Sequence, residues 1–405
     1  MVRRSTRPVC AVLAVMGVTT LAGAAPAWAA PSAFTPGDLV VYEVGTVGGA
    51  TPSATSAPVS LWDYSAAGVP SGFVVTFPST VTKGPHGATH ALVDAGTATD
   101  DGELTVSGDG QFLYATGYDD NAGVADVTTV PGIGRMVGIV SGTGVMDTST
   151  VLTDATTEGP SDGPNALRSA TGTTGASGSF YTGGQGGLGA ATDGASGATY
   201  LNTTAVHQVL ISDGQLYAST PAGVVAVGSG LPSTAPQTDT ALVPSPPPGS
   251  DPDGFAFATL GPGSSPDTLY VADTGAGHVE KYSLVDGTWT LEGAVPVPEV
   301  EGIAVRVSAG VASIYVTDAT TTSAPFDSVL SELTDSSGPG GTLTSPVTTL
   351  ASAPSGEAFK SLAFAPGTPP ADTPEAPAVA ALPALGGLVV GAVVLARRER
   401  RRRAA

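Results

Sequence analysis

One pattern recurs along the chain: an apolar strand, a turn that contains glycine, and a second strand centred on tyrosine. It occurs in five segments, 103–116, 166–183, 208–220, 255–273 and 303–318. Short runs of Val, Leu, Tyr and Thr between Gly, Asp and Pro are typical of strands, and no helical period accompanies them. The pattern therefore predicts an all-β fold built from repeated strand pairs.

The tyrosines of these strands mark the length of the repeat. They are Tyr114, Tyr181, Tyr217, Tyr270 and Tyr315, and Tyr42 in "DLVVYEVG" makes a sixth. Tyr42 has no partner strand before it, whereas "FKSLAFAPG" (359–367) is a first strand with nothing after it. The two complete each other if the last strand closes the first blade, which is how a propeller avoids an open seam.

The fold class that we predict is an all-β, six-bladed β-propeller. Further strand-like stretches follow Tyr42, Tyr114 and Tyr270 and fill out four-stranded blades. Seven blades are the alternative, because the gap from Tyr42 to Tyr114 is long, and a pair of β-sandwiches is a third arrangement with the same strand content.

The quoted strand pairs also carry a resemblance. "LTVSGDGQFLYATGYDDNAG", "DTLYVADTGAGHVEKYSL" and "VEGIAVRVSAGVASIYVTD" resemble the blades of secreted YVTN, NHL and lactonase-like propellers. The likeness covers most of residues 38–366 at the level of the repeat. It implies a fold, and it implies no particular activity, since one fold hosts many functions.

The N-terminus has the organisation of a signal peptide. Three arginines precede an apolar run from Val9 to Ala25, and Ala27-Trp28-Ala29 is a small-x-small cleavage pattern. We expect residues 1–29 to be removed and 30–366 to form the propeller. Cys10, the single cysteine, would leave with the signal peptide, so the mature domain is expected to contain no disulfide.

The C-terminus has the organisation of an anchor. A proline-rich stalk, 367–377, precedes 19 uncharged residues, 378–396, enough to span a bilayer as a helix. The basic tail, 397–405, follows and predicts a cytoplasmic C-terminus through Arg397, Arg398, Arg400, Arg401, Arg402 and Arg403. We therefore expect an extracytoplasmic protein anchored to the membrane or cell surface.

The same tail resembles two processed sorting signals. The order of a proline-glutamate motif, an apolar helix and an arginine cluster resembles PEP-CTERM tails, with the motif at Pro374, Glu375, Ala376 and Pro377. "LPALG" (382–386) is similar to the L-P-x-T-G signal, but Leu385 stands in place of the threonine. The resemblance implies a sorting peptidase as partner, and a permanent membrane anchor is the alternative.

Charge limits the partners of the propeller. Residues 30–396 hold six basic residues against 34 acidic ones, within a chain of net charge −20. Such a surface repels phosphate backbones, so nucleic acid is excluded as a partner.

Candidate metal ligands lie in loops after several strands. His86 and His90 share the loop "GPHGATH", and Asp119, Asp273 and Asp318 each follow a tyrosine strand. Loops that leave equivalent strands emerge on one face of a propeller, so these groups could converge on calcium or another divalent cation. The alternative is that each Asp caps its own turn.

Two functions fit these features. The first is a non-catalytic surface propeller that binds an extracellular ligand or protein. The second is a metal-dependent lactonase or esterase with its site at the channel. No residue set in the sequence fixes a reaction, and the catalytic residues stay unassigned at this stage.

Overall fold

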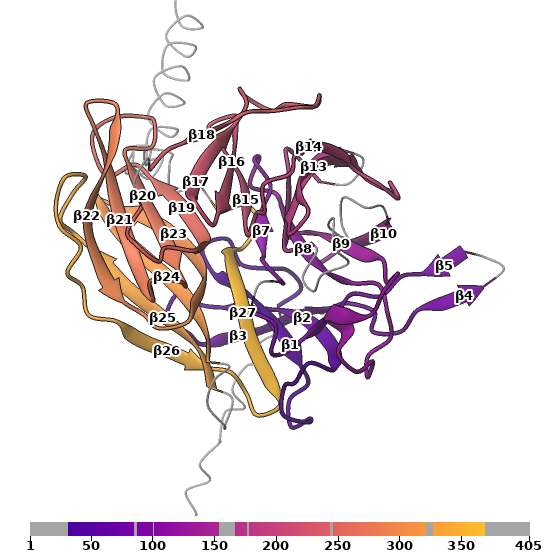
Figure 1. Ribbon diagram of the computed structural model, residues 1–405. Coiled ribbons are helices and arrows are strands. Elements are labelled where there is room, and N and C mark those ends of the chain that lie inside the picture. Colours follow the sequence, from indigo (N-terminus) through magenta and orange to yellow (C-terminus); the bar gives the residue numbers. More distant parts are fainter. Residues whose placement is uncertain are drawn as a thin grey trace, which may run out of the picture. The chain divides into compact units, whose positions relative to one another are not determined.

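The structure, a computed structural model, describes residues 31–84, 87–99, 101–153, 167–175, 178–243, 246–320 and 327–368 (Figure 1). Within these ranges every regular element is a strand, apart from one turn of 3-10 helix, η1 (Val127–Thr129). The predicted all-β class is confirmed for the described residues.

Four sheets each consist of four consecutive antiparallel strands. The predicted strand pairs at 166–183, 208–220, 255–273 and 303–318 supply the first two strands of these sheets. The strands are β11 (Ser169–Gly172), β12 (Ser179–Gly184), β13 (Gly187–Thr192) and β14 (Thr199–Asn202); β15 (Val209–Ser212), β16 (Gln215–Thr220), β17 (Gly223–Val227) and β18 (Asp239–Ala241); β19 (Pro252–Ala258), β20 (Thr268–Asp273), β21 (His278–Val285) and β22 (Thr288–Pro296); β23 (Val300–Ser308), β24 (Val311–Thr320), β25 (Asp327–Asp335) and β26 (Thr348–Ser352).

The remaining strands form one larger sheet and a hairpin. The larger sheet has the order β10-β9-β8-β6-β2-β1-β27, with β3 beside β2 and β7 beside β8. Its strands are β1 (Leu39–Gly45), β2 (Ser56–Tyr64), β3 (Pro70–Thr76), β6 (Val93–Ala95), β7 (Thr105–Val106), β8 (Phe112–Tyr118), β9 (Arg135–Ser141), β10 (Met146–Leu152) and β27 (Glu357–Phe364). The hairpin consists of β4 (Thr82–Gly84) and β5 (Gly87–Thr89), which pair only with each other in the described structure.

The last strand closes onto the first. β27 pairs antiparallel with β1, with Phe364 opposite Leu39 and Glu357 opposite Gly45. Phe359 and Leu362 of β27 pack with Leu39 in one buried core cluster. The predicted pairing of the two ends of the domain is confirmed.

The first strands of successive sheets contact one another in a closed circuit. Following the chain, β7 contacts β11, β11 contacts β15, the β15 sheet reaches β19 through β16, β19 contacts β23, β23 contacts β27, and β27 returns to β7. A circuit of four-stranded sheets that meet through their first strands is the arrangement of a β-propeller, and the circuit encloses a central channel.

The tyrosine strands hold the circuit together. In the segments 114–116, 217–219 and 315–317, a hydroxyl residue stands two positions after the tyrosine. Each hydroxyl donates a 2.8 Å hydrogen bond to a first-strand carbonyl of the next sheet: Thr116 to Arg168, Ser219 to Asp253 and Thr317 to Lys360. The repeat therefore places Arg168, Asp253 and Lys360 at one level of the channel.

The predicted membrane anchor is not found. A spanning helix needs about 20 consecutive apolar residues, and no helix within the described ranges is long and apolar enough to cross a membrane. The segments on which the prediction rested, 1–29, 374–377, 378–396 and 397–403, lie outside the described residues. We therefore correct the predicted localisation and do not retain the anchored protein with a cytoplasmic C-terminus.

Candidate active site

A layer of charged side chains crosses the channel where the first strands begin. Each four-stranded sheet contributes one residue at its start and the larger sheet contributes two, and none of the six is more than 5% exposed. We name this set the charged layer; its members are Glu103, Arg168, His207, Asp253, Glu301 and Lys360. In a chain with only 12% charged residues, so many buried charges at one level indicate a site.

Hydrogen bonds between neighbouring first strands fix this level. The acceptors are side-chain oxygens of the residues that directly follow Lys360, Arg168 and His207. Each accepts a hydrogen bond from a backbone N–H of the next first strand: Ser361 Oγ from Leu104 at 2.7 Å, Ser169 Oγ from Val209 at 3.0 Å, and Gln208 Oε1 from Phe255 at 2.8 Å. The layer is thus set by the packing of the strands, without depending on loop conformation.

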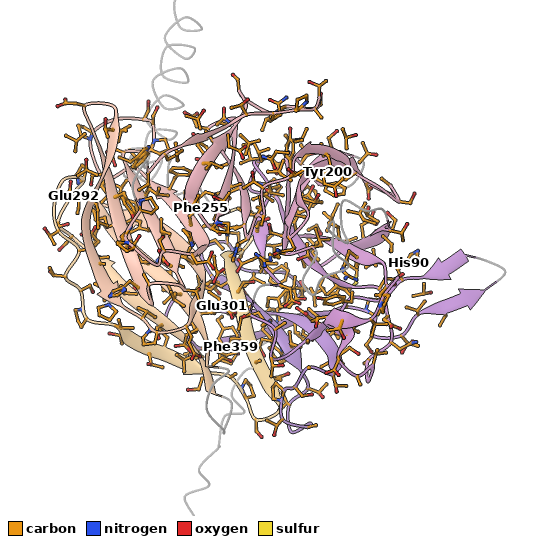
Figure 2. All side chains as sticks on the ribbon, viewed as in Figure 1. His90, Tyr200, Phe255, Glu292, Glu301 and Phe359 are labelled. Carbon is orange, nitrogen blue, oxygen red and sulfur yellow. The ribbon has the colours of Figure 1, made fainter. Side chains whose placement is uncertain are left out.

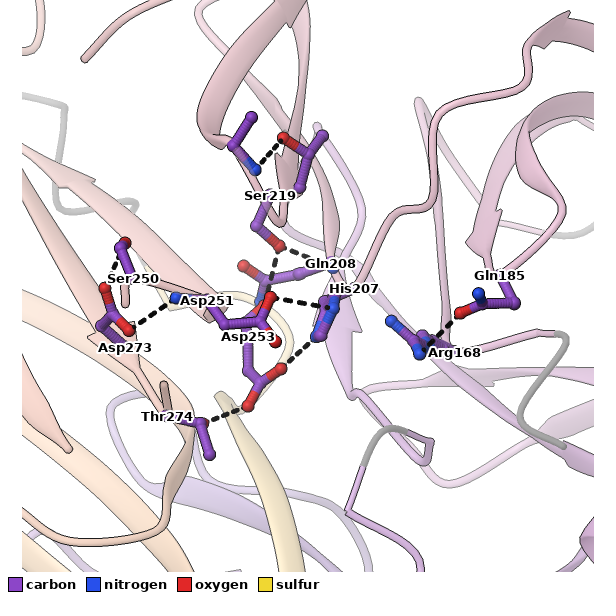
Figure 3. Close-up of polar contacts among 12 residues, drawn as sticks. Arg168, Gln185, His207, Gln208, Ser219, Ser250, Asp251, Asp253, Asp273 and Thr274 are labelled. Carbon is purple, nitrogen blue, oxygen red and sulfur yellow. Dashed lines mark hydrogen bonds and ion pairs between the residues drawn. The ribbon is translucent and has the colours of Figure 1, made fainter. Parts of the chain in front are cut away.

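His207 and Asp253 form a hydrogen-bonded pair within the layer (Figure 3). The Asp253 carboxylate contacts His207 Nδ1 through Oδ1, and its Oδ2 accepts a hydrogen bond from Thr274 Oγ1. A carboxylate at Nδ1 selects the tautomer that carries its proton there, which leaves Nε2 as an acceptor. His207 is therefore oriented as a general base.

Nε2 of His207 faces Asp251, a less buried residue. The distance from Nε2 to Asp251 Oδ1 is 3.5 Å, and the Asp251 side chain is 48% exposed. Asp251 is held through its backbone, whose N–H donates to Asp273 Oδ1 at 2.8 Å. Neither an unprotonated Nε2 nor a carboxylate oxygen has a proton to donate, so this contact is not a hydrogen bond, and a water or another small molecule could take its place beside Nε2.

Arg168 supplies a cation on the neighbouring strand. Its Nη2 donates to Gln185 Oε1 at 3.0 Å, and Figure 3 shows both residues in the same region as His207. Ser169, the next residue, accepts the hydrogen bond from the strand that carries His207. A planar guanidinium at this position suits an oxygen that develops negative charge.

The opposite part of the layer is built around Lys360. Its Nζ lies 3.3 Å from Asp101 Oδ1, and the charges of Glu301 and Asp94 also act on it. Burial raises the pKa of Glu301 well above its usual range, against the lowering effect of Lys360. Burial also raises the pKa of Glu103 to about 8, with Asp253 raising it further and Lys360 lowering it. Burial thus favours the protonated form of both glutamates.

These buried acids predict a stability that falls as pH rises. Below pH 4.5 Glu103 is protonated in both the folded and the unfolded chain. Between pH 4.5 and about 8 the unfolded chain loses this proton while the folded chain keeps it, so the free energy of unfolding falls as pH rises. Glu43, whose pKa burial raises to about 9, acts in the same direction. We expect Tm to fall between pH 5.5 and 8.5. Glu103→Gln, which mimics the protonated acid, should reduce this fall of Tm in thermal melts. A Tm that falls with pH as steeply as in the wild type would contradict the raised pKa of Glu103.

A cavity adjoins the charged layer. Its volume is about 360 Å³, and it is lined by the residues that follow the layer on five of the first strands, with Leu104, Gln208, Phe255, Ile303 and Leu362 nearest to the layer in sequence. Figure 2 shows Phe255 and Glu301 in the interior, between the sheets. We call it the channel cavity. The charged layer thus has a cavity beside it.

The predicted metal ligands are not assembled into one site. His86 lies outside the described residues. His90 and Asp119 are brought together, with Nδ1 2.8 Å from Oδ2. Asp273 accepts from the backbone N–H of Ala276 at 2.8 Å, and Asp318 accepts from that of Val329 at 3.2 Å, as turn and strand residues do. In the described ranges no three His, Cys, Asp or Glu side chains form a group that could hold a metal.

The sequence analysis missed His207, Asp253 and Glu301. Its strand segments began one residue after His207 and two residues after Asp253 and Glu301, although Arg168 and Lys360 lay within them. The signal that could have found them is positional: when the repeats are aligned on their tyrosine strands, a charged residue or histidine stands at the start of each first strand.

Comparisons with known proteins find similar solved structures and no matching family. No family model matches the chain, and no curated protein matches it. Among solved structures, it is similar to the periplasmic gluconolactonase PpgL of Pseudomonas aeruginosa, at 14% identity and a TM-score of 0.46, over 81% of this chain and 99% of that one.

Two further structures show the breadth of the likeness. One is a putative 6-phosphogluconolactonase of Bacteroides uniformis, at 13% identity and a TM-score of 0.42, over 78% of this chain and 83% of that one. The other is a chain of a nidogen/laminin complex, at 10% identity and a TM-score of 0.45, over 82% of this chain and 99% of that one. The similar structures thus include both lactonase-like enzymes and a chain of a protein complex.

Proposed function

We propose that the protein is a hydrolase of neutral lactones or esters, with its site at the charged layer. The observation that carries this proposal is the His207–Asp253 pair. The Asp253 carboxylate orients the buried imidazole, and Nε2 faces Asp251, whose place a small molecule could take. This pair favours a hydrolase over the non-catalytic surface binder, and it differs from the metal-dependent hydrolase of the sequence analysis in that His207 activates the water.

The proposed reaction adds water across the acyl C–O bond. His207 Nε2 removes a proton from a water molecule as the water oxygen bonds to the carbonyl carbon. Asp253 stabilises the imidazolium that forms, and Arg168 stabilises the negative charge on the carbonyl oxygen. When the C–O bond breaks, the imidazolium returns its proton to the departing alkoxide. A lactone yields a hydroxy acid, and an ester yields an acid and an alcohol.

The electrostatics of the layer favour a neutral substrate. Asp253 belongs to it, Asp101 lies beside its Lys360, and the whole chain has a net charge of −20. An anionic substrate would be repelled on approach and would lose its hydration in a buried site. The hydroxy acid product, an anion at neutral pH, would be expelled for the same reason.

We further propose that the sheets make six blades. The four consecutive sheets are four of them, and the larger sheet divides into β27-β1-β2-β3 and β7-β8-β9-β10. This division gives every blade four strands and one residue of the charged layer, which supports six over seven.

A panel of neutral γ- and δ-lactones and aryl esters tests the function. We expect the purified protein to hydrolyse at least one member. Asp253→Asn should lower kcat by roughly 10²–10⁴-fold, because the amide selects the wrong imidazole tautomer. Asp251→Asn, which changes only the weak Nε2 contact, should alter kcat by less than about tenfold. No hydrolysis of any member, or equal loss in both variants, would overturn the proposal.

A further inference from the structure

The channel cavity is large enough for a small molecule and mostly apolar. Its 360 Å³ lies within the range of roughly 300–1,000 Å³ that ligand pockets occupy. The walls are largely aliphatic and aromatic, and among the described lining residues the only ionisable side chain is Asp213, which is exposed in the turn between β15 and β16. The principal apolar walls are Leu210, Phe255, Phe257, Ile303, Val305 and Leu362.

The aromatic wall is held in place from behind. The Phe255 and Phe257 rings lie 5.9 Å apart, nearly perpendicular to each other. Phe257 also packs against Tyr217 at 4.6 Å and Trp289 at 6.0 Å, measured between ring centroids. Aromatic contacts of this geometry are favourable beyond their buried area. The wall is therefore pre-formed, which reduces the entropy cost of binding a ligand.

One polar group at the layer side of the cavity has an unused hydrogen-bond donor. Gln208 lines the cavity, is 4% exposed, and accepts the Phe255 N–H through Oε1 at 2.8 Å. That contact fixes which end of the amide is oxygen. In the described part of the chain, no hydrogen bond is found from Gln208 Nε2 to another group. An amide donor that no protein group accepts is available to an acceptor on a molecule in the cavity.

Three other polar groups of the lining are already used. Thr105 Oγ1 donates to the carbonyl of Ala170, and Thr368 Oγ1 donates to that of Ala365. Ser107 Oγ likewise donates to Asp109 Oδ1 at 2.6 Å. These hydroxyls can offer only weak secondary contacts, so Gln208 is the buried lining residue whose donor best suits the polar end of a bound molecule.

We infer that the channel cavity binds an uncharged small molecule with an apolar body and a single hydrogen-bond acceptor, the acceptor oxygen meeting Gln208 Nε2. Charged molecules are rejected because the lining offers no cation and because burial of an unpaired charge is costly. This site goes beyond the proposed hydrolysis: binding here requires neither His207 nor turnover.

Three probes of one shape test the inference on the full chain. They are 2-acetylnaphthalene, which has an acceptor, 2-ethylnaphthalene, which has none, and 2-naphthoate, which is charged; binding is measured by equilibrium dialysis. We expect 2-acetylnaphthalene to bind roughly fivefold more tightly than 2-ethylnaphthalene, as one neutral hydrogen bond allows, and 2-naphthoate not to bind. Equal binding of all three, or binding of none, would overturn the inference.

Variants locate the binding. Ala256→Leu fills the cavity from a half-buried lining position and should abolish binding of 2-acetylnaphthalene. Ala241→Leu makes the same change at an exposed residue of β18 and should leave binding unchanged. Gln208→Met should remove the preference for 2-acetylnaphthalene over 2-ethylnaphthalene; this ratio is insensitive to a general loss of stability. A preference that survives Gln208→Met contradicts the assigned donor.

The chain's own tail is the competing occupant. Thr368 lines the cavity, and residues 369–405 follow it. If the full chain fails to bind 2-acetylnaphthalene while a chain lacking residues 369–405 binds it, the tail fills the cavity and the small-molecule inference is wrong. Equal binding by both chains supports the inference.

Discussion

A chain from Pro31 that ends at Gly356 is expected to lose cooperative unfolding, whereas one that ends at Thr368 keeps it. The difference is β27, which supplies the partner of β1 and closes the circuit of sheets. Burial of Phe359 and Leu362 alone contributes about 3–6 kcal/mol, a large part of the 5–15 kcal/mol by which domains are typically stable. The measurement is urea denaturation followed by circular dichroism.

A circular permutant is the matched control for this truncation. Placing residues 353–368 ahead of residue 36 restores β27 beside β1, because the end of β27 meets the start of β1, where the N–H of Ala365 donates to the carbonyl of Asp38 at 2.9 Å. The permutant should unfold cooperatively, like the chain that ends at Thr368. Cooperative unfolding of the chain that ends at Gly356 would show that the closure is dispensable and would contradict this account.

Lys360→Met is expected to lower the free energy of unfolding by about 3–5 kcal/mol. Lys360 and Asp101 are both buried, and removal of one partner from a buried ion pair leaves the other charge uncompensated. Burial raises the pKa values of the acids beside them, Asp94 and Glu301, which favours the neutral forms of these acids, and neither form of a carboxyl group can replace the lost positive charge. Denaturant titration at pH 7 measures the change.

A double variant separates the lost pairing from lost packing. Lys360→Met combined with Asp101→Asn removes both charges, and the asparagine keeps an oxygen for the Tyr118 hydroxyl, which donates to Asp101 at 2.9 Å. We expect the double variant to recover at least 1 kcal/mol relative to Lys360→Met, as coupled sites do. If the free energy of unfolding of Lys360→Met lies within 1 kcal/mol of the wild-type value, Lys360 does not compensate the buried charge of Asp101, and the prediction is wrong.

The fold could be predicted from the sequence because its signals are local. Alternating apolar residues and glycine turns specify each strand pair, and the unpaired strands at 38–45 and 359–367 specified the closure. The structure adds a second role for the tyrosine strands, which the pattern did not reveal: the hydroxyl residues Thr116, Ser219 and Thr317 join neighbouring sheets. That role depends on register between sheets, which local periodicity does not encode.

The site could not be predicted in the same way because its residues are far apart in the chain. Glu103 and Lys360 share one layer although they are 257 positions apart, as the Leu104–Ser361 hydrogen bond beside them shows. The sequence analysis instead placed its candidate histidines, His86 and His90, in one loop, and His90 lies beside the β4–β5 hairpin and away from Glu301 (Figure 2). The candidate histidines were close in sequence and belong to a hairpin region. The charged layer, in contrast, is assembled from single residues that come from different repeats.

The rate of hydrolysis by His207→Gln, set beside that of His90→Gln, tests the central claim most directly. Both histidines meet an aspartate through Nδ1, but only His207 belongs to the charged layer. With the lactone or ester that the wild type hydrolyses best, we predict that His207→Gln lowers kcat/KM at least 100-fold, while His90→Gln stays within about twofold of wild type. Retention of the wild-type rate by His207→Gln, in a protein that still unfolds at the wild-type Tm, would contradict the account.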